Sequence, residues 1–536
     1  MLSKQEQYKY TLFIFLIVFT YFWNIWLNDI WNPNEGYYAE AVREMFESGN
    51  FIDIYYNYEH RFNKPPLTYW LVASSCFLFG INEFAIRLPI VLLGLGSLFF
   101  TYKIAQLLFD NIRISLFSAF IMSFPLQFVS NTRYATPEVP LTFFFTLTLY
   151  LFLKWYKTNK IKYLYLSYIA LGLTVLTKGF PYIIVIGGII IVFLFIESNY
   201  NVKDWWNKFV KLKIWIGLPI VIVIGFWWYV YSYLKYGDLF WNVYYKETLG
   251  RAFGNKHKLL TLKSLTYYFN VILWGFLPYS LTAYFVVVNY IKQVRKFAFL
   301  FSWIFVMLFI FTISKGKLPT YIIQMFPALS IFIAYAIVNL SLEGWRKHVY
   351  NFTFLIQTLI LVIATFLLIY FIHLDYLYYI FAIFPILYMI RYKDTKLAPF
   401  VSALVLFLVF VISGLVKIEK YRPYDEIGKA VKESFVSRDI PFFLEGKILF
   451  NLPFYIERKV HMEVPVSKIL NIKSEKLVLV RDKYLNLFNN YETLWKGKIY
   501  KGHSEAKFAK FLSAIIKAEN GDLSEFEDYT LIHVLR

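Results

Sequence analysis

Residues 164–197 read LYLSYIALGLTVLTKGFPYIIVIGGIIIVFLFIE, two apolar runs joined by the short polar segment TKG. Each run approaches the roughly 20 apolar residues that an α-helix needs to cross a lipid bilayer. In lipid the backbone must satisfy its own hydrogen bonds, so runs of this length form helices rather than open strands. This stretch therefore predicts two consecutive membrane-spanning helices.

The same pattern recurs along most of the chain. Of its 536 residues 59% are hydrophobic and only 17% are charged, which excludes a water-soluble protein of this size. We predict an all-α polytopic membrane protein with about thirteen transmembrane helices. They begin near residues 10, 86, 113, 138, 164, 179, 213, 267, 297, 318, 350, 376 and 398.

Positive charge is distributed unevenly among the loops. The net charge is +20, but Lys and Arg lie mainly in short loops at 110–113, 154–162, 203–213, 292–296, 346–347 and 391–396, so we expect no nucleic-acid partner. Cytoplasmic loops of membrane proteins carry such an excess of Lys and Arg. The N-terminus is therefore expected in the cytoplasm. A first outer loop (28–87), a second (236–267) and the chain after Lys417 are expected on the opposite side.

Two domains are predicted. Residues 1–417 form a transmembrane catalytic domain, and residues 418–536 form a small extracytoplasmic α/β domain. In the second domain, helical patterns at 425–435 and 504–518 alternate with β-like runs such as KILF (447–450) and KLVLV (476–480). In the first outer loop, EGYYAEAVREMFESGN (35–50) predicts a helix that ends on a Gly-Asn stop.

Several cations are expected on the outer side, where the loop-charge rule does not explain them. Taken singly, each cation can be explained as a side chain that extends toward the lipid headgroups. As a set they indicate an anionic ligand, for which a lipid-linked phosphate is the natural choice at this depth. The set comprises Arg61, Lys64, Arg133, Lys178, Lys246, Arg251, Lys315 and Lys317.

A transfer enzyme also needs a group that orients the acceptor and takes its proton, usually a carboxylate. The outer carboxylates near these cations are Glu35, Glu40, Asp53, Glu59 and Glu138. Glu35 has an alternative explanation, because an acidic residue in the first turn of a helix is favoured by the helix dipole.

Six motifs resemble the successive signatures of the polyprenyl-phosphate sugar transferases. They are WNPNEGYYAEAVREM (31–45), FNKPPLTYW (62–70), IRLP (86–89), NTRYATPEVPLTFFFTL (131–147), GLTVLTKGFP (172–181) and KGKLPTYIIQMFPAL (315–329). The likeness is to the GT-C superfamily, on the branch of the protein mannosyltransferases and the lipid A aminoarabinose transferases. The number of spans and the outer C-terminal domain resemble the aminoarabinose branch.

The resemblance implies roles for individual residues. Lys64 and Arg251 would hold the carrier phosphate, Tyr321 and Lys178 would line the same cavity, and Tyr38 would belong to the first-loop signature. The remaining candidates for the substrate cavity are Asn63, Arg61, Lys317, Lys246 and Arg133, and those for catalysis are Glu35, Asn34 and Glu138.

Three of these positions depart from the usual pattern of the family. An acidic pair is common where Asn34 and Glu35 stand, a Glu is common at Asn63, and an Asp is more common at Glu138. The identity of the catalytic carboxylate is therefore open.

The predicted function is an inverting transfer of a sugar from an undecaprenyl-phosphate-type donor to an outer-face acceptor, with an aminoarabinose-like sugar and a lipid A phosphate favoured. The alternatives are transfer of mannose, another hexose or a uronic acid to a protein or glycan hydroxyl, and a transporter of lipid-linked sugars. We expect a monomer in the bacterial inner membrane that contacts membrane lipids. No cofactor is required and no metal-ligand set is predicted, because no nucleotide loop or metal-ligand spacing is present, and the role of a divalent cation stays open.

Overall fold

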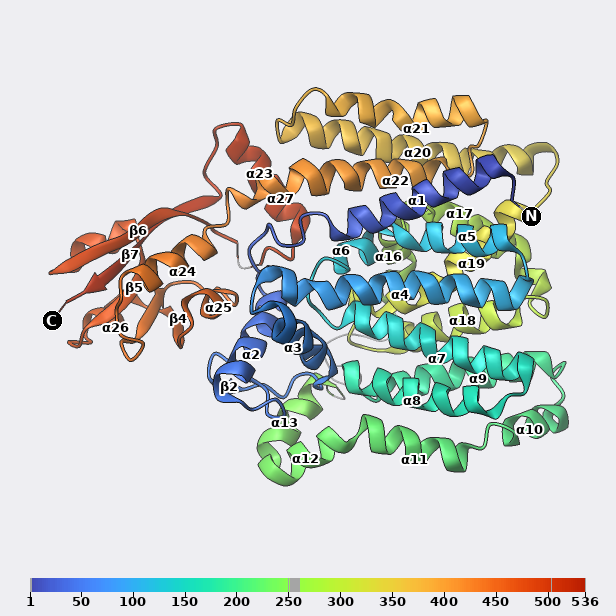
Figure 1. Cartoon of the computed structure of the whole chain (residues 1–536), viewed down its shortest axis with the longest axis horizontal. Coiled ribbons are helices and arrows are strands. Elements are labelled where there is room, and N and C mark those ends of the chain that lie inside the picture. The colour runs from blue at the N-terminus through green and yellow to red at the C-terminus, as the bar shows by residue number, and fades with distance from the viewer. Residues whose placement is uncertain (1, 249, 251–260, 503, 536) are drawn as a thin grey trace.

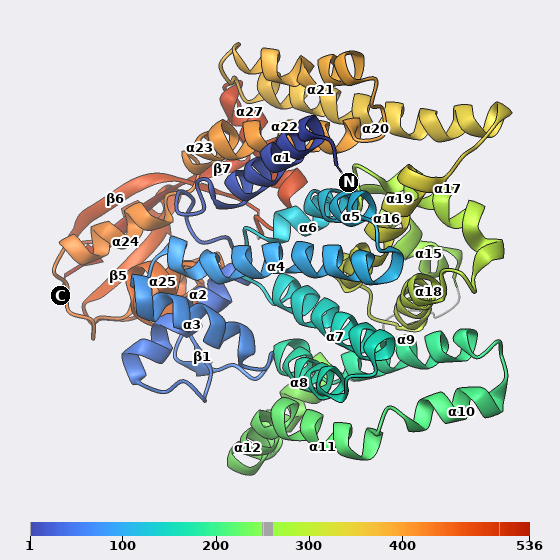
Figure 2. The same ribbon diagram turned by 45° about the vertical axis from the view of Figure 1, so that its right-hand side comes forward.

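The computed structural model describes residues 2–248, 250, 261–502 and 504–535. Most of the chain forms one bundle whose helices lie side by side (Figures 1 and 2). The principal helices are α1 (Lys4–Phe22), α4 (Glu83–Phe109), α5 (Ile112–Ser123), α7 (Glu138–Thr158), α8 (Ile161–Lys178), α9 (Pro181–Glu197), α11 (Ile214–Gly225), α12 (Trp227–Tyr236), α16 (Tyr267–Gly275), α17 (Ser280–Tyr290), α18 (Ala298–Ile313), α19 (Phe326–Asn339), α20 (Gly344–Phe371), α21 (Tyr378–Tyr392) and α22 (Ala398–Val409). Each apolar run in the sequence falls on one of these helices, as predicted.

Shorter elements connect them. They are α6 (Leu126–Asn131), α10 (Val202–Val210), α13 (Asp238–Glu247), α15 (Leu262–Leu265), the 3-10 helices η1 (Ile291–Gln293) and η2 (Pro319–Met325), the π-helical turn η3 (Phe410–Gly414) and α23 (Leu415–Glu419).

Within the described residues, five helices are long and apolar enough to cross a membrane. They are α4, α7, α20, η2 with α19, and α22 with its continuation to Glu419. Two further pairs would each form one bent span: α11 with α12 at 51°, and α17 with η1 and α18 at 120°. The number of thirteen spans therefore stays a prediction.

Local sequence explains where several helices begin and end. The side chains of Asn82 and Asn111 cap the first turns of α4 and α5 by accepting backbone N–H bonds. Gly179 adopts φ +124° between α8 and α9, and Pro181 starts α9 in the first-turn position that proline favours. The break leaves Lys178 at the last position of α8.

The segment predicted to be the first outer loop, which we call the first outer segment after that prediction, contains α2 (Asn34–Ser48), the short hairpin of β1 (Tyr55–Tyr56) and β2 (Glu59–His60), and α3 (Leu67–Phe79). The predicted helix over 35–50 is confirmed as α2, and Gly49 ends it with φ +70°. Most of α2 is buried, because it lies between the bundle and the C-terminal domain (Figure 1).

The C-terminal domain is a small α/β structure. Its five-stranded sheet has the order β4-β3-β5-β7-β6, in which β3 is parallel to β4 and β5 while β7 is antiparallel to β5 and β6. The strands are β3 (Phe442–Glu445), β4 (Val460–Val464), β5 (Lys476–Arg481), β6 (Tyr491–Tyr500) and β7 (Phe526–Val534). The helices are α24 (Tyr424–Glu433), α25 (Leu452–Ile456), α26 (Val466–Leu470), the 3-10 turn η4 (Asp482–Leu487) and α27 (Phe508–Glu519).

Most of the predicted elements of this domain are present, with one error. KLVLV forms β5, the helix at 425–435 is α24, and the helix at 504–518 is the shorter α27. The prediction of a strand at KILF is wrong, because the strand is the preceding FFLE and Gly446, with φ +60°, turns the chain out of the sheet. Phe450 instead donates its backbone N–H to the Asn32 side chain in the first outer segment.

Buried arginines join the first outer segment to both neighbours. Arg87 of α4 and Arg422 of the C-terminal domain each donate to the backbone carbonyl of Asp29, at 2.9 Å in both cases. Arg422 also pairs with buried Glu505 at 3.0 Å. A Cβ at Gly36 would lie 2.5 Å from a backbone oxygen of the C-terminal domain, so only glycine allows this close approach. The start of α2 is therefore held from two sides.

Candidate functional site

Four of the predicted residues come together where loops and helix ends meet. Glu138 is the first residue of α7 and Lys178 is the last residue of α8, and the Lys178 Nζ lies 2.8 Å from Glu138 Oε1. Both positions suit the helix dipoles, which favour an anion at the N-terminus and a cation at the C-terminus. The Lys178 Nζ also lies 5.5 Å from the centre of the Tyr321 ring.

Lys64 joins this group from the first outer segment. It lies close enough to Glu138 for the two charges to interact, and its Nζ is 4.0 Å from Glu247 Oε2 at the end of α13. We call Lys64, Glu138, Lys178 and Tyr321 the charged cluster. Its two cations come from positions far apart in sequence, which is the convergence that an anionic ligand requires.

An aromatic layer borders the charged cluster. Tyr38 of α2 stacks on Tyr69 of α3, with ring centres 4.4 Å apart. Burial raises the pKa of the Tyr38 phenol well above its ordinary value, so this phenol stays neutral. Arg61 donates from Nε to the Tyr69 hydroxyl at 3.1 Å, and its guanidinium carbon lies 3.7 Å from the centre of the Tyr37 ring.

Glu35 is buried and its carboxylate is fully engaged. Oε1 accepts from Arg87 Nε at 2.8 Å and from the Ala135 N–H at 3.0 Å. Oε2 accepts from Arg87 Nη2 at 2.8 Å and from the Trp31 N–H at 2.9 Å. These four donors occupy the hydrogen-bonding sites of both carboxylate oxygens. This geometry fits a residue that holds the first outer segment in position.

The remaining candidates are bound to helix ends, exposed or only partly buried. Arg133 donates to the carbonyls of Thr20, Tyr21 and Trp23 at the end of α1, and Lys317 donates to those of Phe311, Thr312 and Ser314 at the end of α18. Lys246 is exposed on α13, Asn34 is exposed at the start of α2, and Asn63 is half-buried beside Lys64. Arg251 lies outside the described residues.

Three residues of the site were not predicted individually. Tyr69 contacts both Tyr38 and Arg61, Glu247 faces Lys64, and Arg87 binds Glu35. Tyr69 and Arg87 stand inside the motifs FNKPPLTYW and IRLP, and Glu247 stands in KETLGRAF (246–253), the stretch that also holds Arg251. A polar residue within a motif was the available signal, but the partner of each depends on how distant helices pack.

Comparisons with known proteins agree with this architecture. The profile of the family described as dolichyl-phosphate-mannose-protein mannosyltransferase matches residues 9–239. A protein of Aquifex aeolicus (strain VF5), described as uncharacterized, is 31% identical over 526 residues, which cover 98% of this chain and 99% of that protein.

Two further relatives have more specific descriptions. The undecaprenyl phosphate-alpha-4-amino-4-deoxy-L-arabinose arabinosyl transferase 1 of Proteus mirabilis (strain HI4320) is 27% identical over 346 residues, which cover 63% of this chain and 61% of that protein. The crystal structure of ArnT from Cupriavidus metallidurans bound to undecaprenyl phosphate superposes with a TM-score of 0.73 at 20% identity, covering 90% of this chain and 96% of that one. This chain is a glycosyltransferase that resembles the aminoarabinose transferase branch of the GT-C superfamily.

Proposed function

We propose that this glycosyltransferase moves a sugar from a polyprenyl-phosphate carrier to an acceptor on the non-cytoplasmic side of the membrane. The charged cluster carries the proposal, because Lys64 and Lys178 converge on one carboxylate beside the neutral phenol of Tyr38. The names of the arabinosyl transferase relative and of the ArnT complex support a donor of the undecaprenyl-phosphate type.

In the proposed reaction, an acceptor oxygen attacks the anomeric carbon of the sugar and the bond from that carbon to the carrier phosphate breaks. The carrier phosphate leaves with the electron pair and gains negative charge. Lys64 and Arg251 stabilise that charge, and the cations are worth more at a site from which water is largely excluded than in bulk water. Attack from the face opposite the phosphate inverts the anomeric centre.

The acceptor determines whether a base is needed. A hydroxyl must lose a proton, whereas a phosphate is already ionised at neutral pH. Glu35 is committed to four donors, so Glu138 is the carboxylate that is better placed to act. Amides at Asn34 and Asn63, where relatives often have acids, leave less negative charge near an anionic acceptor. A lipid A phosphate is therefore the favoured acceptor, with an aminoarabinose-like sugar.

A transporter of lipid-linked sugars would place ionisable residues near the bilayer centre and break its helices in matched halves. Glu138 and Lys178 instead stand at the ends of α7 and α8. An enzyme at the membrane boundary accounts better for this position.

The proposed function predicts transfer by the purified protein. With undecaprenyl-phosphate-linked sugars as donors, we expect a sugar-sized mass increase on lipid A, measured by mass spectrometry. Lipid A and total glycolipid from cells with and without the protein should differ by the same mass. A mass increase on protein or glycan hydroxyls instead would show that the acceptor is a hydroxyl and not a lipid A phosphate. No transfer from any of these donors would defeat the proposal.

The proposed orientation places the first outer segment and the C-terminal domain on the non-cytoplasmic side. The contact between Asn32 and Phe450 requires these two parts to share one side of the membrane. They lie at one end of the bundle, whereas the lysine-rich α10 lies at the other (Figure 1). Positive charge marks the cytoplasmic end.

Cysteine labelling tests this orientation. In a Cys76→Ser background, exposed Lys429→Cys in the C-terminal domain should react with a membrane-impermeant maleimide in intact spheroplasts. Exposed Lys157→Cys should react only after permeabilisation. The reverse labelling pattern would show that the proposed orientation is wrong.

A further inference from the structure

Arg61 has no carboxylate partner among the described residues. Arg133 and Arg458 also lack one, but the guanidinium of each donates to three backbone carbonyls. Arg43, Arg87 and Arg422 each bind a carboxylate at 2.7–3.0 Å, and those carboxylates are almost completely buried. Among the described residues, no carboxylate lies within ion-pair distance of Arg61. The titratable groups that interact with it most strongly are the phenols of Tyr69, Tyr38 and Tyr37. Burial raises the pKa of Tyr37 and of Tyr38, so neither phenol supplies a negative charge.

The guanidinium of Arg61 is nevertheless held in one orientation. Its Nε donates to the Tyr69 hydroxyl at 3.1 Å, and the Tyr37 ring stacks at 3.7 Å from its central carbon. The backbone N–H of Arg61 donates to the Ile54 carbonyl at 2.8 Å, which fixes the start of the side chain. A half-buried cation without a counter-ion is costly, unless a ligand supplies the missing charge.

The position of Arg61 separates it from the donor-phosphate residues. Tyr69, which binds Arg61, stacks on Tyr38, and Tyr38 lies near enough to Glu138 for their charges to interact. Arg61 is therefore one aromatic layer away from the charged cluster. On its other side, Tyr37 packs against Phe450 of the C-terminal domain, with ring centres 4.8 Å apart. In the proposed orientation this is the outer side, from which the acceptor, as opposed to the carrier-linked donor, would approach.

We propose that Arg61 binds the phosphate group of the acceptor and selects phosphorylated over neutral acceptors. The inference rests on the proposed function and names the residue of that same site that binds the acceptor. A guanidinium can grip a phosphate with two parallel hydrogen bonds, and a stacked, preoriented one loses little freedom when it does so.

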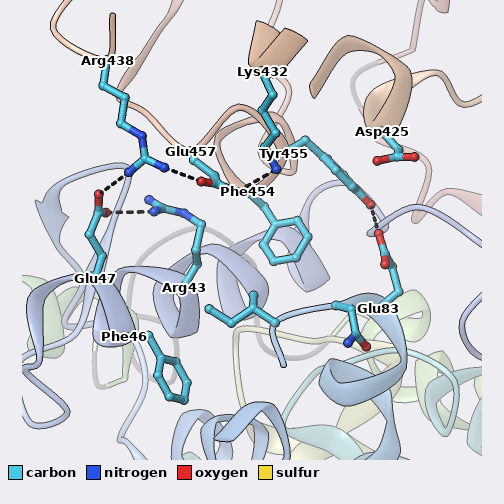
Figure 3. Close-up of a pocket in the computed structure, with 12 residues that line it drawn as sticks. Arg43, Phe46, Glu47, Glu83, Asp425, Lys432, Arg438, Phe454, Tyr455 and Glu457 are labelled. Carbon is cyan, nitrogen blue, oxygen red and sulfur yellow. Dashed lines mark hydrogen bonds and ion pairs between the residues drawn. The ribbon is translucent and has the colours of Figure 1, made fainter. Parts of the chain in front are cut away.

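A second group of arginines provides the contrast and the control. A groove of about 430 Å³ lies between α2 and the C-terminal domain, and Arg43, Lys432 and Arg438 line it (Figure 3). Each cation there already has a carboxylate: Arg438 lies 2.6 Å from Glu457 and 3.5 Å from Glu47. Arg438 is well exposed and pairs with Glu47 at the end of α2, so Arg438→Gln removes a guanidinium without touching the site.

The test measures the acceptor and the donor separately with the purified full-length protein. Arg61→Gln should raise the KM for phosphorylated lipid A by at least about tenfold, since a hydrogen-bonded charge is lost. The KM for the donor and the melting temperature should not change. Arg61→Lys should restore part of the acceptor affinity, and Arg438→Gln should behave like the wild type. An unchanged acceptor KM, or a donor KM that rises equally, would overturn the inference.

A binding measurement separates this inference from the proposed function. Isothermal titration with glucosamine 1-phosphate, in the absence of donor, should show binding to the wild type that weakens at least about tenfold in Arg61→Gln. Equal binding by both proteins overturns the role of Arg61, even if transfer is observed. Absence of transfer by the wild type defeats the proposed function, whatever the titration shows.

Discussion

Lys64→Ala should lower the turnover of sugar transfer by at least about two orders of magnitude, as the loss of one preorganised electrostatic contact to the transition state usually does. Lys64 lies beside Glu247 and acts on Glu138, so its ammonium is already held where loop and helix ends meet. The carrier phosphate gains charge as the sugar departs, and the alanine variant offers no cation in that place.

Two substitutions sharpen this prediction. Lys64→Arg should recover only part of the rate, because a planar fork replaces a compact point charge. Lys429→Ala removes an exposed lysine of the C-terminal domain and should leave transfer unchanged. Rates measured with purified carrier-linked sugar, at matched protein level, decide the matter. If Lys64→Ala keeps a near-wild-type rate, the phosphate is held elsewhere. The same assay applies to Arg251→Ala, for which the resemblance implies a similar loss.

The helices of the bundle could be predicted because apolar length alone demands them. A run such as 181–197 has no other way to satisfy its backbone in lipid, and the structure has α9 there. The charged cluster was also predictable in part. Lys178 precedes a glycine and Lys64 precedes two prolines, so both stand where a helix ends or begins and a charge can leave the apolar layer.

Long-range partners could not be predicted in the same way. Glu35 had the features of a catalytic carboxylate, but Arg87, 52 residues away in sequence, binds both of its oxygens. Arg133 had the features of a ligand cation, yet its donors meet the carbonyls at the end of α1. Which cation closes a helix end and which remains for a ligand depends on the packing of α1, α4 and α7, and no local pattern encodes it.

The ion pair of Lys178 and Glu138 should show the second large effect, since the two partners contribute differently. Lys178→Met removes the cation that lies 2.8 Å from the largely buried Glu138 carboxylate and leaves Lys64 as the remaining cation near it; breaking such a pair from one side costs about 3–5 kcal/mol. Turnover should fall by at least about 100-fold, because a carboxylate with one cation fewer would also repel the carrier phosphate. The double variant Lys178→Met/Glu138→Gln should regain the melting temperature but not the rate.

Glu138→Gln then distinguishes the two classes of acceptor. It keeps the shape of the side chain, leaves Lys178 free to meet the phosphate, and removes the only member of the charged cluster that can take a proton. With a phosphate acceptor no proton moves, so the variant should retain transfer to within about tenfold of the wild type and show the same dependence on pH. Asn63→Glu, which adds a carboxylate beside Lys64, should be impaired in that case.

A hydroxyl acceptor requires the opposite result. Glu138→Gln would be nearly inactive, and the wild-type rate would fall as a carboxylate becomes protonated. Rate profiles of the wild type and both variants across pH separate these cases, and an inactive Gln variant with a normal melting temperature would exclude the phosphate acceptor.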